Sequence, residues 1–293
     1  MTRRAPAYVI ATAAVCLAVP VLFAQSERIS IRQAPRPDQT VRMTMNQSMD
    51  MDLTIEGLPG GGGPVKMAMK MALAMTQKTG AARPDGSYDS EITLGQFNTT
   101  VEMNGQPLPG VAPQNQMEGR TITLTYDGNG QIVDVKDPSG SAQADAIRTM
   151  LRGFTANLPV STIGVGETVT TPLEFSLPLP IPGGSPIKVS GETKMKLVSV
   201  GNDGGSRVAT FESTSDGKIS GDQANPAGGG MNIDLTLGGG GTTVIDLEKG
   251  VLRSGETRTK FSGKLSTSGN GNAAPALPGI SMQGTMTVSI ATN

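Results

Sequence analysis

The chain has 293 residues, with 24 basic and 25 acidic side chains, no His, no Trp and one Cys. The absence of His excludes imidazole as a general base, His-assisted serine or cysteine nucleophiles and most zinc sites. A formal net charge of −1 provides no basic surface for nucleic acid, so we expect no nucleic-acid partner.

The first 24 residues have the pattern of a secretory signal peptide. Arg3 and Arg4 precede an apolar run from Val9 to Phe23, and Ala24 is a small residue suited to cleavage. We therefore predict a signal peptide over residues 1–24 and an exported protein of the bacterial periplasm or cell envelope. Either the run is cleaved or it anchors the chain. Residues 25–40 are predicted to form a flexible N-terminal segment.

After residue 40 the strongest pattern has a period of two. From Val41 to Ile55, and again from Val65 to Met75, apolar side chains fill every second position apart from Gln47. Strict alternation is typical of β-strands with one buried face. The Gly-rich connection between the two segments predicts a hairpin.

The alternation also predicts a register for this hairpin. If Ile55 pairs with Val65, all the apolar side chains share one face and Asp50 lies opposite Lys70.

Further strands are predicted from the same kind of pattern along the chain. They are Tyr88–Met103 with a bulge at Gly95, Arg120–Tyr126, Gln131–Lys136, Ile187–Val200, Arg207–Ser215, Met231–Leu237, Thr242–Glu248, Val251–Leu265 and Ile280–Thr292.

One segment predicts a helix instead. Within residues 141–158, five apolar residues fall on one side of a 3.6-residue period: Ile147, Met150, Leu151, Phe154 and Leu158. The expected fold is therefore mainly β, with long curved antiparallel sheets arranged as a half-barrel or in two lobes. We expect a single domain over 41–293, whose lobes of about 41–136 and 168–292 are separated by this amphipathic helix.

Methionine is the most informative residue type, with 16 in the chain. Eight of them share the apolar face of the first two predicted strands: Met43, Met45, Met49, Met51, Met67, Met69, Met71 and Met75. Met-lined surfaces are adaptable and suit varied apolar partners. We predict that this face binds a lipid, another apolar ligand or a segment of an envelope protein.

Two alternatives remain open for the same methionines. They could fill the core of a structural or interaction module that binds no ligand, because Met packs well into irregular gaps. They could also bind Cu(I) or Ag(I), since thioethers suit soft metals.

Sites of other kinds are not indicated. Asp127-Gly-Asn-Gly130 begins like a calcium loop, but Pro138 stands where the bidentate Glu should be. The carboxylates of the strands lie on predicted polar faces, and no pair stands out for acid–base chemistry. We therefore expect no enzyme, no catalytic residue, no cofactor and, apart from the copper alternative, no metal site.

Three features together resemble a bacterial family of exported β-rich proteins of unknown function. These are the alternating Met strands, the segment Ile163–Val169 and the segment Val244–Leu252. The resemblance spans about Val41 to Leu265. More remotely, long curved strands with one helix are similar to the half-barrels of LolA-like periplasmic lipoprotein carriers, a resemblance that implies lipid carriage.

Overall fold

A computed structural model describes residues 28–30, 35–55, 63–108, 118–136, 162–177, 187–224, 230–268 and 279–293. This part of the chain is mainly β, as predicted, and contains strands and turns but no helix. None of its residues form a helix long and apolar enough to cross a membrane. The predicted signal peptide at 1–24 and the predicted helix at 141–158 lie outside the described residues.

The strands follow the alternating segments of the sequence. They are β1 (Arg28–Ser30), β2 (Thr40–Ile55), β3 (Val65–Thr79), β4 (Tyr88–Met103), β5 (Gln106–Pro107), β6 (Thr121–Tyr126), β7 (Ile132–Lys136), β8 (Thr162–Gly164), β9 (Thr168–Leu177), β10 (Ile187–Asp203), β11 (Ser206–Ala224), β12 (Gly230–Asp246), β13 (Val251–Ser268) and β14 (Ile280–Thr292). β1 lies within the segment that was expected to be flexible, and it pairs with β8 in a small separate ribbon.

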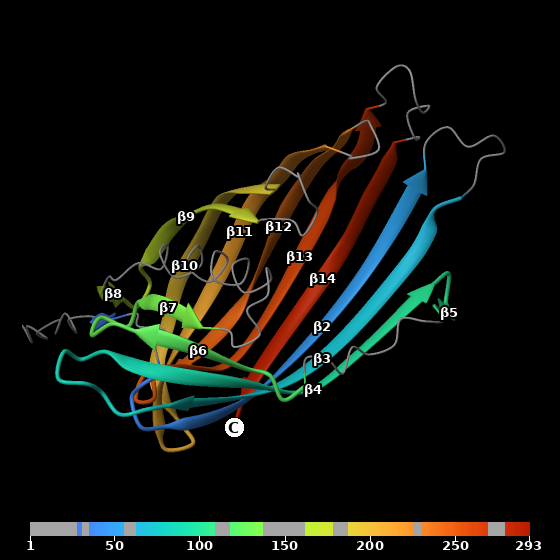
Figure 1. Cartoon of the computed structure of the whole chain (residues 1–293). Coiled ribbons are helices and arrows are strands. Elements are labelled where there is room, and N and C mark those ends of the chain that lie inside the picture. Colours follow the sequence, from blue (N-terminus) through green and yellow to red (C-terminus); the bar gives the residue numbers. More distant parts are fainter. Residues whose placement is uncertain are drawn as a thin grey trace, which may run out of the picture.

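Twelve strands form one antiparallel sheet in the order β7-β6-β4-β3-β2-β14-β13-β12-β11-β10-β9, with β5 beside β4 (Figure 1). The two runs of strands predicted from the sequence meet at the centre of this sheet, where β2 pairs with β14. Among the described residues the edge strands β7 and β9 do not pair with each other, so the sheet stays open.

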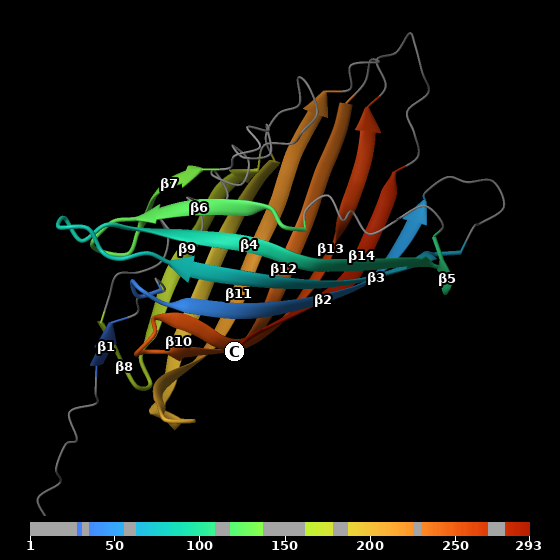
Figure 2. The same ribbon diagram turned by 60° about the horizontal axis from the view of Figure 1, so that its bottom comes forward.

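The sheet curls strongly across its width. Figure 2 shows β4, β6 and β7 running at a steep angle across the strands of the other half. A right-handed twist between neighbouring strands accumulates over a sheet of this size, and it curls the sheet into a trough.

The hairpin of β2 and β3 differs in register from the prediction. Val65 pairs with Leu53 rather than with Ile55, and Lys70 faces Ser48 instead of Asp50. The shift is two residues, which preserves the face of every side chain because the side-chain period is also two. The predicted bulge near Gly95 is confirmed by a register shift opposite Leu73 and Met75.

The second half contains one longer strand where two were predicted. β12 passes through Gly238–Gly241 without a break, although four successive glycines usually indicate a turn. A Cβ on Gly241 would lie 2.0 Å from the carbonyl oxygen of Glu256, and one on Gly239 would lie 2.4 Å from that of Arg258. The glycines therefore allow neighbouring strands to approach where the sheet bends, as glycine kinks do in curved sheets.

Pairing assigns the side chains to two faces with different chemistry. We call the face that carries Met49 and Phe261 the inner face, and its reverse the outer face. Along β13 the outer side chains are all exposed, from Glu256 to Ser266, whereas the inner ones from Gly255 to Leu265 are partly buried. β13 is thus amphipathic along this stretch, with one face in water and the other turned to the interior of the trough.

Two buried clusters close one end of the trough. The first combines Leu197 and Phe211 of the inner face with Ile29 and Ile163 of the β1·β8 ribbon. The second is formed by four inner-face side chains of β4, β6 and β7: Tyr88, Leu124, Tyr126 and Val135. We call this the closed end, and we call the opposite end, at Ile55 and Val65, the open end.

Candidate functional site

The eight predicted methionines all lie on the inner face. Cross-strand pairs join Met43 to Met75, Met49 to Met69 and Met51 to Met67. Met45 lies opposite Leu73, and Met71 lies opposite Gln47. Each of the eight is partly exposed, in contrast to the clusters of the closed end. The methionines therefore form an accessible surface in the described part of the chain.

The apolar surface continues beyond these two strands in rows that cross the sheet. The second row from the open end consists of Val65, Leu53, Met282, Gly263, Leu235, Ile219 and Val189. The third consists of Met103, Met67, Met51, Gly284, Phe261 and Leu237. The alternation that predicted the strands could also have identified the apolar residues of the second half. It could not show that these residues lie beside the methionines, because that depends on the pairing of β2 with β14.

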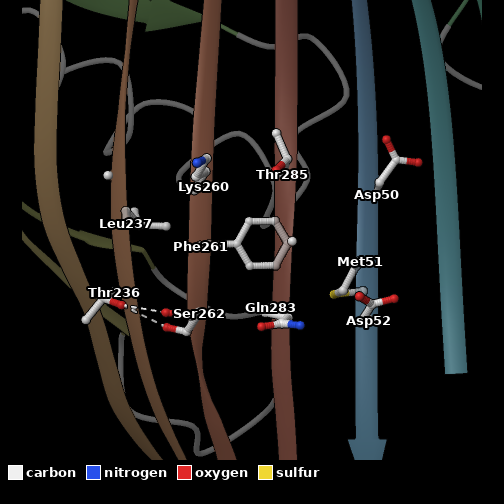
Figure 3. Close-up of a pocket in the computed structure, with 12 residues that line it drawn as sticks. Asp50, Met51, Asp52, Thr236, Leu237, Lys260, Phe261, Ser262, Gln283 and Thr285 are labelled. Atoms are coloured by element: carbon white, nitrogen blue, oxygen red, sulfur yellow. Dashed lines mark hydrogen bonds between the residues drawn. The ribbon is translucent and has the colours of Figure 1, made fainter. Parts of the chain in front are cut away.

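Phe261 covers a gap in this surface. Its ring lies across Gly284 of the neighbouring strand (Figure 3), and a Cβ on Gly284 would stand 2.5 Å from the ring. An aromatic ring packed over a cross-strand glycine protects backbone that would otherwise be exposed. The pair also keeps the surface apolar where β13 meets β14.

Small side chains occupy the middle of the inner face in the second half of the sheet. Thr171, Thr193, Ser215, Gly239 and Thr259 lie side by side on β9 to β13. Thr193 and Ser215 share a hydrogen bond of 2.8 Å between their hydroxyl groups. In the middle of the trough, therefore, long flexible side chains line one half and short ones line the other.

The inner face is uncharged along this surface. Of the side chains that the structure describes between the buried clusters and the open end, none on the inner face is ionisable. The charges lie on the outer face, where Asp52 pairs across the strands with Lys66. Because a charge moved away from water without a partner costs several kcal/mol, this surface suits uncharged groups.

Two polar side chains interrupt the methionine half. The Gln47 amide donates to the thioether of Met286 at 3.3 Å, and the buried Thr99 hydroxyl has no hydrogen-bond partner among the residues that the structure describes. Thr99 pairs with Met71, which pairs with Gln47, so the two polar groups lie on either side of Met71. Neither residue was predicted to belong to a site; the signal for Gln47 was a polar side chain in an apolar series.

A hollow of about 670 Å³ lies on the outer face (Figure 3). Its polar lining comes from four adjacent strands: Asp50, Asp52, Thr236, Lys260, Ser262, Gln283 and Thr285. Thr236 donates to the Ser262 carbonyl at 3.0 Å. Solvated charges and hydroxyls of this kind recur along the outer face. The lining of the hollow therefore does not differ in its chemistry from the rest of that face.

Among the ionisable groups with shifted pKa values, Tyr126 and Glu167 lie at or near the closed end, whereas Lys194, whose pKa is raised by its hydrogen bond to Glu192, lies on the outer face of β10. Burial raises the pKa of Tyr126 to about 12. Hydrogen bonds from the Gly164 amide and from Arg28 lower the pKa of Glu167, which connects β1 to the turn after β8. Tyr126 and Glu167 stabilise the closed end rather than forming a reactive site.

Comparisons with known proteins assign no family. No family model matches the chain, and no curated protein matches it. Among solved structures, lipovitellin, in a structure of its lipid–protein interactions, has a TM-score of 0.43 at 12% identity. That match covers 86% of this chain but only 25% of lipovitellin. An outer membrane channel from Pseudomonas putida F1 has a TM-score of 0.21 at 8% identity, with 89% of this chain and 98% of the channel covered. At this level of overlap neither neighbour assigns a function.

Proposed function

We propose that this is a non-enzymatic, exported protein of the bacterial envelope that binds the acyl chains of a lipid on its inner face. The observation that carries the proposal is a methionine-rich, uncharged surface, partly exposed at the open end of the trough. Covering such a surface with acyl chains would gain roughly 25 cal/mol for each Å² of apolar area removed from water. The lipid headgroup would remain in water at the open end.

A lipid fits this face better than a protein segment. An extended segment would bring backbone N–H and C=O groups, each of which needs a hydrogen-bond partner when it is buried. The methionine half offers Gln47 and Thr99 for this purpose and otherwise presents apolar atoms. Acyl chains have no such requirement, and flexible Met side chains can adapt to their shape.

Lipid binding can be tested with a matched pair of variants on β3. Met69 faces inward, and its neighbour Ala68 faces outward between Asp50 and Glu102. We expect Met69→Lys to lower the affinity for a fluorescent fatty acid at least tenfold, because it places a charge on the apolar surface. Ala68→Lys introduces the same charge on the outer face and should leave the affinity unchanged.

Folding of both variants is checked by circular dichroism, and Met69→Gln provides a milder change if Met69→Lys unfolds. Native mass spectrometry of the protein purified from its own envelope provides a second readout, with lipid adducts as the expected result. Equal affinities for the two Lys variants, or a wild-type protein that binds no fatty acid, would contradict the proposal.

A second candidate function, Cu(I) binding, is favoured by one row of side chains. Met69, Met49 and Met286 are direct neighbours on β3, β2 and β14, so three thioethers lie side by side. Thioethers are suitable ligands for Cu(I). Anaerobic Cu(I) titration of the wild type and of Met49→Leu separates this candidate from lipid binding, because the Leu side chain retains the apolar surface but cannot bind the metal.

A further inference from the structure

The methionines of this protein are separated from its buried core. Every methionine whose side chain the structure describes lies on the inner face and is at least partly exposed. The two buried clusters consist instead of Ile, Leu, Val, Ala, Phe and Tyr, and Met195 is the one described methionine that packs against either of them. A chemical change at the thioethers would therefore alter the inner face and leave the packing of the closed end in place.

The thioethers are densest where β14, β2 and β3 meet. Met286, Met49 and Met69 lie side by side in one row, and Met51 lies opposite Met67 in the next row towards the open end. Neighbouring strands are about 4.8 Å apart, so these five side chains form one continuous patch. We call it the thioether patch. It belongs to the surface that the proposed ligand would cover.

An apolar surface does not by itself require methionine, as the other half of the sheet shows. The row that contains Met282 continues across β12, β11 and β10 with aliphatic side chains, Leu235, Ile219 and Val189. The methionine half differs from them in its chemistry, because a thioether is readily oxidised to a sulfoxide. Oxidation would therefore make one half of the inner face polar and leave the other half apolar.

Other side chains that react with oxidants are scarce in this protein. The chain has no Trp and no His, and its one Cys, Cys16, lies in the predicted signal peptide. Tyr88 and Tyr126 are both buried. Peroxides oxidise Cys and Met side chains. Beyond the predicted signal peptide the target of oxidation is therefore methionine, and in the described part of the chain that means the inner face.

We propose that the thioether patch is a site of reversible oxidation, and that its sulfoxides weaken the binding of the apolar ligand. This inference rests on the proposed function and adds its regulation. A sulfoxide turns a flexible apolar side chain into a polar one. An acyl chain laid over it would remove the sulfoxide oxygen from water without offering a hydrogen-bond donor, which is unfavourable. An exported protein also meets oxidants away from the reducing thiols of the cytosol.

The oxidant is a hydroperoxide, and the step is a two-electron transfer. The thioether sulfur donates an electron pair to the outer oxygen of the peroxide, the O–O bond breaks and an S–O bond forms. The remaining oxygen takes the proton of the transferred hydroxyl and leaves as water or as an alcohol. The sulfur is oxidised by two electrons and the peroxide is reduced by two. A methionine sulfoxide reductase reverses the change with a dithiol, which becomes a disulfide while the oxygen leaves as water.

The test measures the affinity for a fluorescent fatty acid before and after treatment with hydrogen peroxide, which is removed with catalase before the ligand is added. Mass spectrometry counts the added oxygens, peptide mapping locates them, and circular dichroism checks the fold. The oxidised protein is then treated with methionine sulfoxide reductases and dithiothreitol, and its affinity is measured again.

The matched variant is Met49→Leu/Met51→Leu/Met67→Leu/Met69→Leu. It retains apolar side chains of similar volume but removes four of the five thioethers of the patch. Met49→Leu/Met69→Leu replaces it if the quadruple variant fails to fold. Met195→Leu is the control, because it makes the same change beside the buried cluster of the closed end.

We expect oxidation to lower the affinity of the wild type and of Met195→Leu at least about tenfold while the fold is retained, and reductase treatment to restore it. The loss in the quadruple variant should be at least about threefold smaller, because Leu is not oxidised. Unchanged affinity after oxidation, an equal loss in the quadruple variant, or unfolding of the oxidised wild type would overturn the inference but not the proposed function. If the untreated wild type binds no fatty acid, both are wrong.

Discussion

At the scale of single residues, polar groups on the inner face differ in how well they are satisfied. Gln77 and Ser90 bond to each other, Tyr88 donates to the Pro35 carbonyl at 2.6 Å, and the Thr99 hydroxyl has no partner in the described part of the chain. The sequence could show that these residues interrupt an apolar series. It could not show which of them finds a partner, because the partners belong to other strands and depend on register.

Thr99→Val should stabilise the protein. Valine has the same shape and removes a buried hydroxyl that makes no hydrogen bond, so the free energy of unfolding of the delipidated protein should rise by about 1 kcal/mol. Ser90→Ala is the control and should lower it by about 1–3 kcal/mol, because it removes the hydroxyl that accepts from the buried Gln77 amide. Chemical denaturation measures both. A destabilised Thr99→Val would mean that the hydroxyl is already satisfied.

Tyr126 should make the protein sensitive to alkaline pH. Burial raises the pKa of its phenol from 10.0 to about 12 in the folded state, so the folded protein holds this proton more tightly than the unfolded chain. The associated stability is complete below pH 10 and is lost as the pH rises to about 12, on the order of 2 kcal/mol in total. Free energies of unfolding measured between pH 9 and 12 should decline less steeply in Tyr126→Phe. Parallel profiles would contradict this assignment.

At the scale of elements, alternation predicted the strands well where side chains carried the pattern. β4 and β14 have the predicted bounds, whereas β12 was divided in two because its glycines resemble a turn. Their role is steric and involves the next strand, so the sequence of β12 alone cannot reveal it. β1 and β8 are three residues each, too short for any period to appear.

Two glycines, one on β12 and one on β10, should respond differently to alanine. In Gly241→Ala the new methyl group would lie 2.0 Å from the Glu256 carbonyl oxygen, so the strands must separate. We expect a loss of about 3 kcal/mol in the free energy of unfolding. Gly201→Ala meets nothing within 4 Å and should be neutral or stabilise by up to about 1 kcal/mol. Thermal denaturation distinguishes them, and similar melting temperatures would argue against close approach at Gly241.

At the scale of the whole molecule, the sequence predicted a curved β-protein with two runs of strands. The structure adds that both runs belong to one sheet, so the apolar face of the first continues into that of the second. This continuity extends the apolar surface beyond the methionine strands into the second half of the sheet. It depends on contacts between the two ends of the chain, and neither end carries a local pattern that specifies the other.

The β2·β14 pairing has a consequence for how the chain folds. It joins residues 43–55 to 280–292, so the central seam of the sheet can form only after nearly the whole chain is available. Pairings so distant in sequence close slowly, and unpaired edges and apolar faces promote aggregation in the meantime.

A chain shortened after residue 279 should therefore lose the seam and expose both β2 and β13 as edges. We expect it to aggregate during refolding at concentrations where the full chain stays monomeric, as measured by light scattering. If the shortened chain refolds as a soluble monomer, the two halves are independent. In the cell, too, the sheet could be completed only once β14 is available, so this last strand would complete the native fold. If the chain crosses a membrane N-terminus first, its methionine strands would need protection from aggregation until β14 arrives.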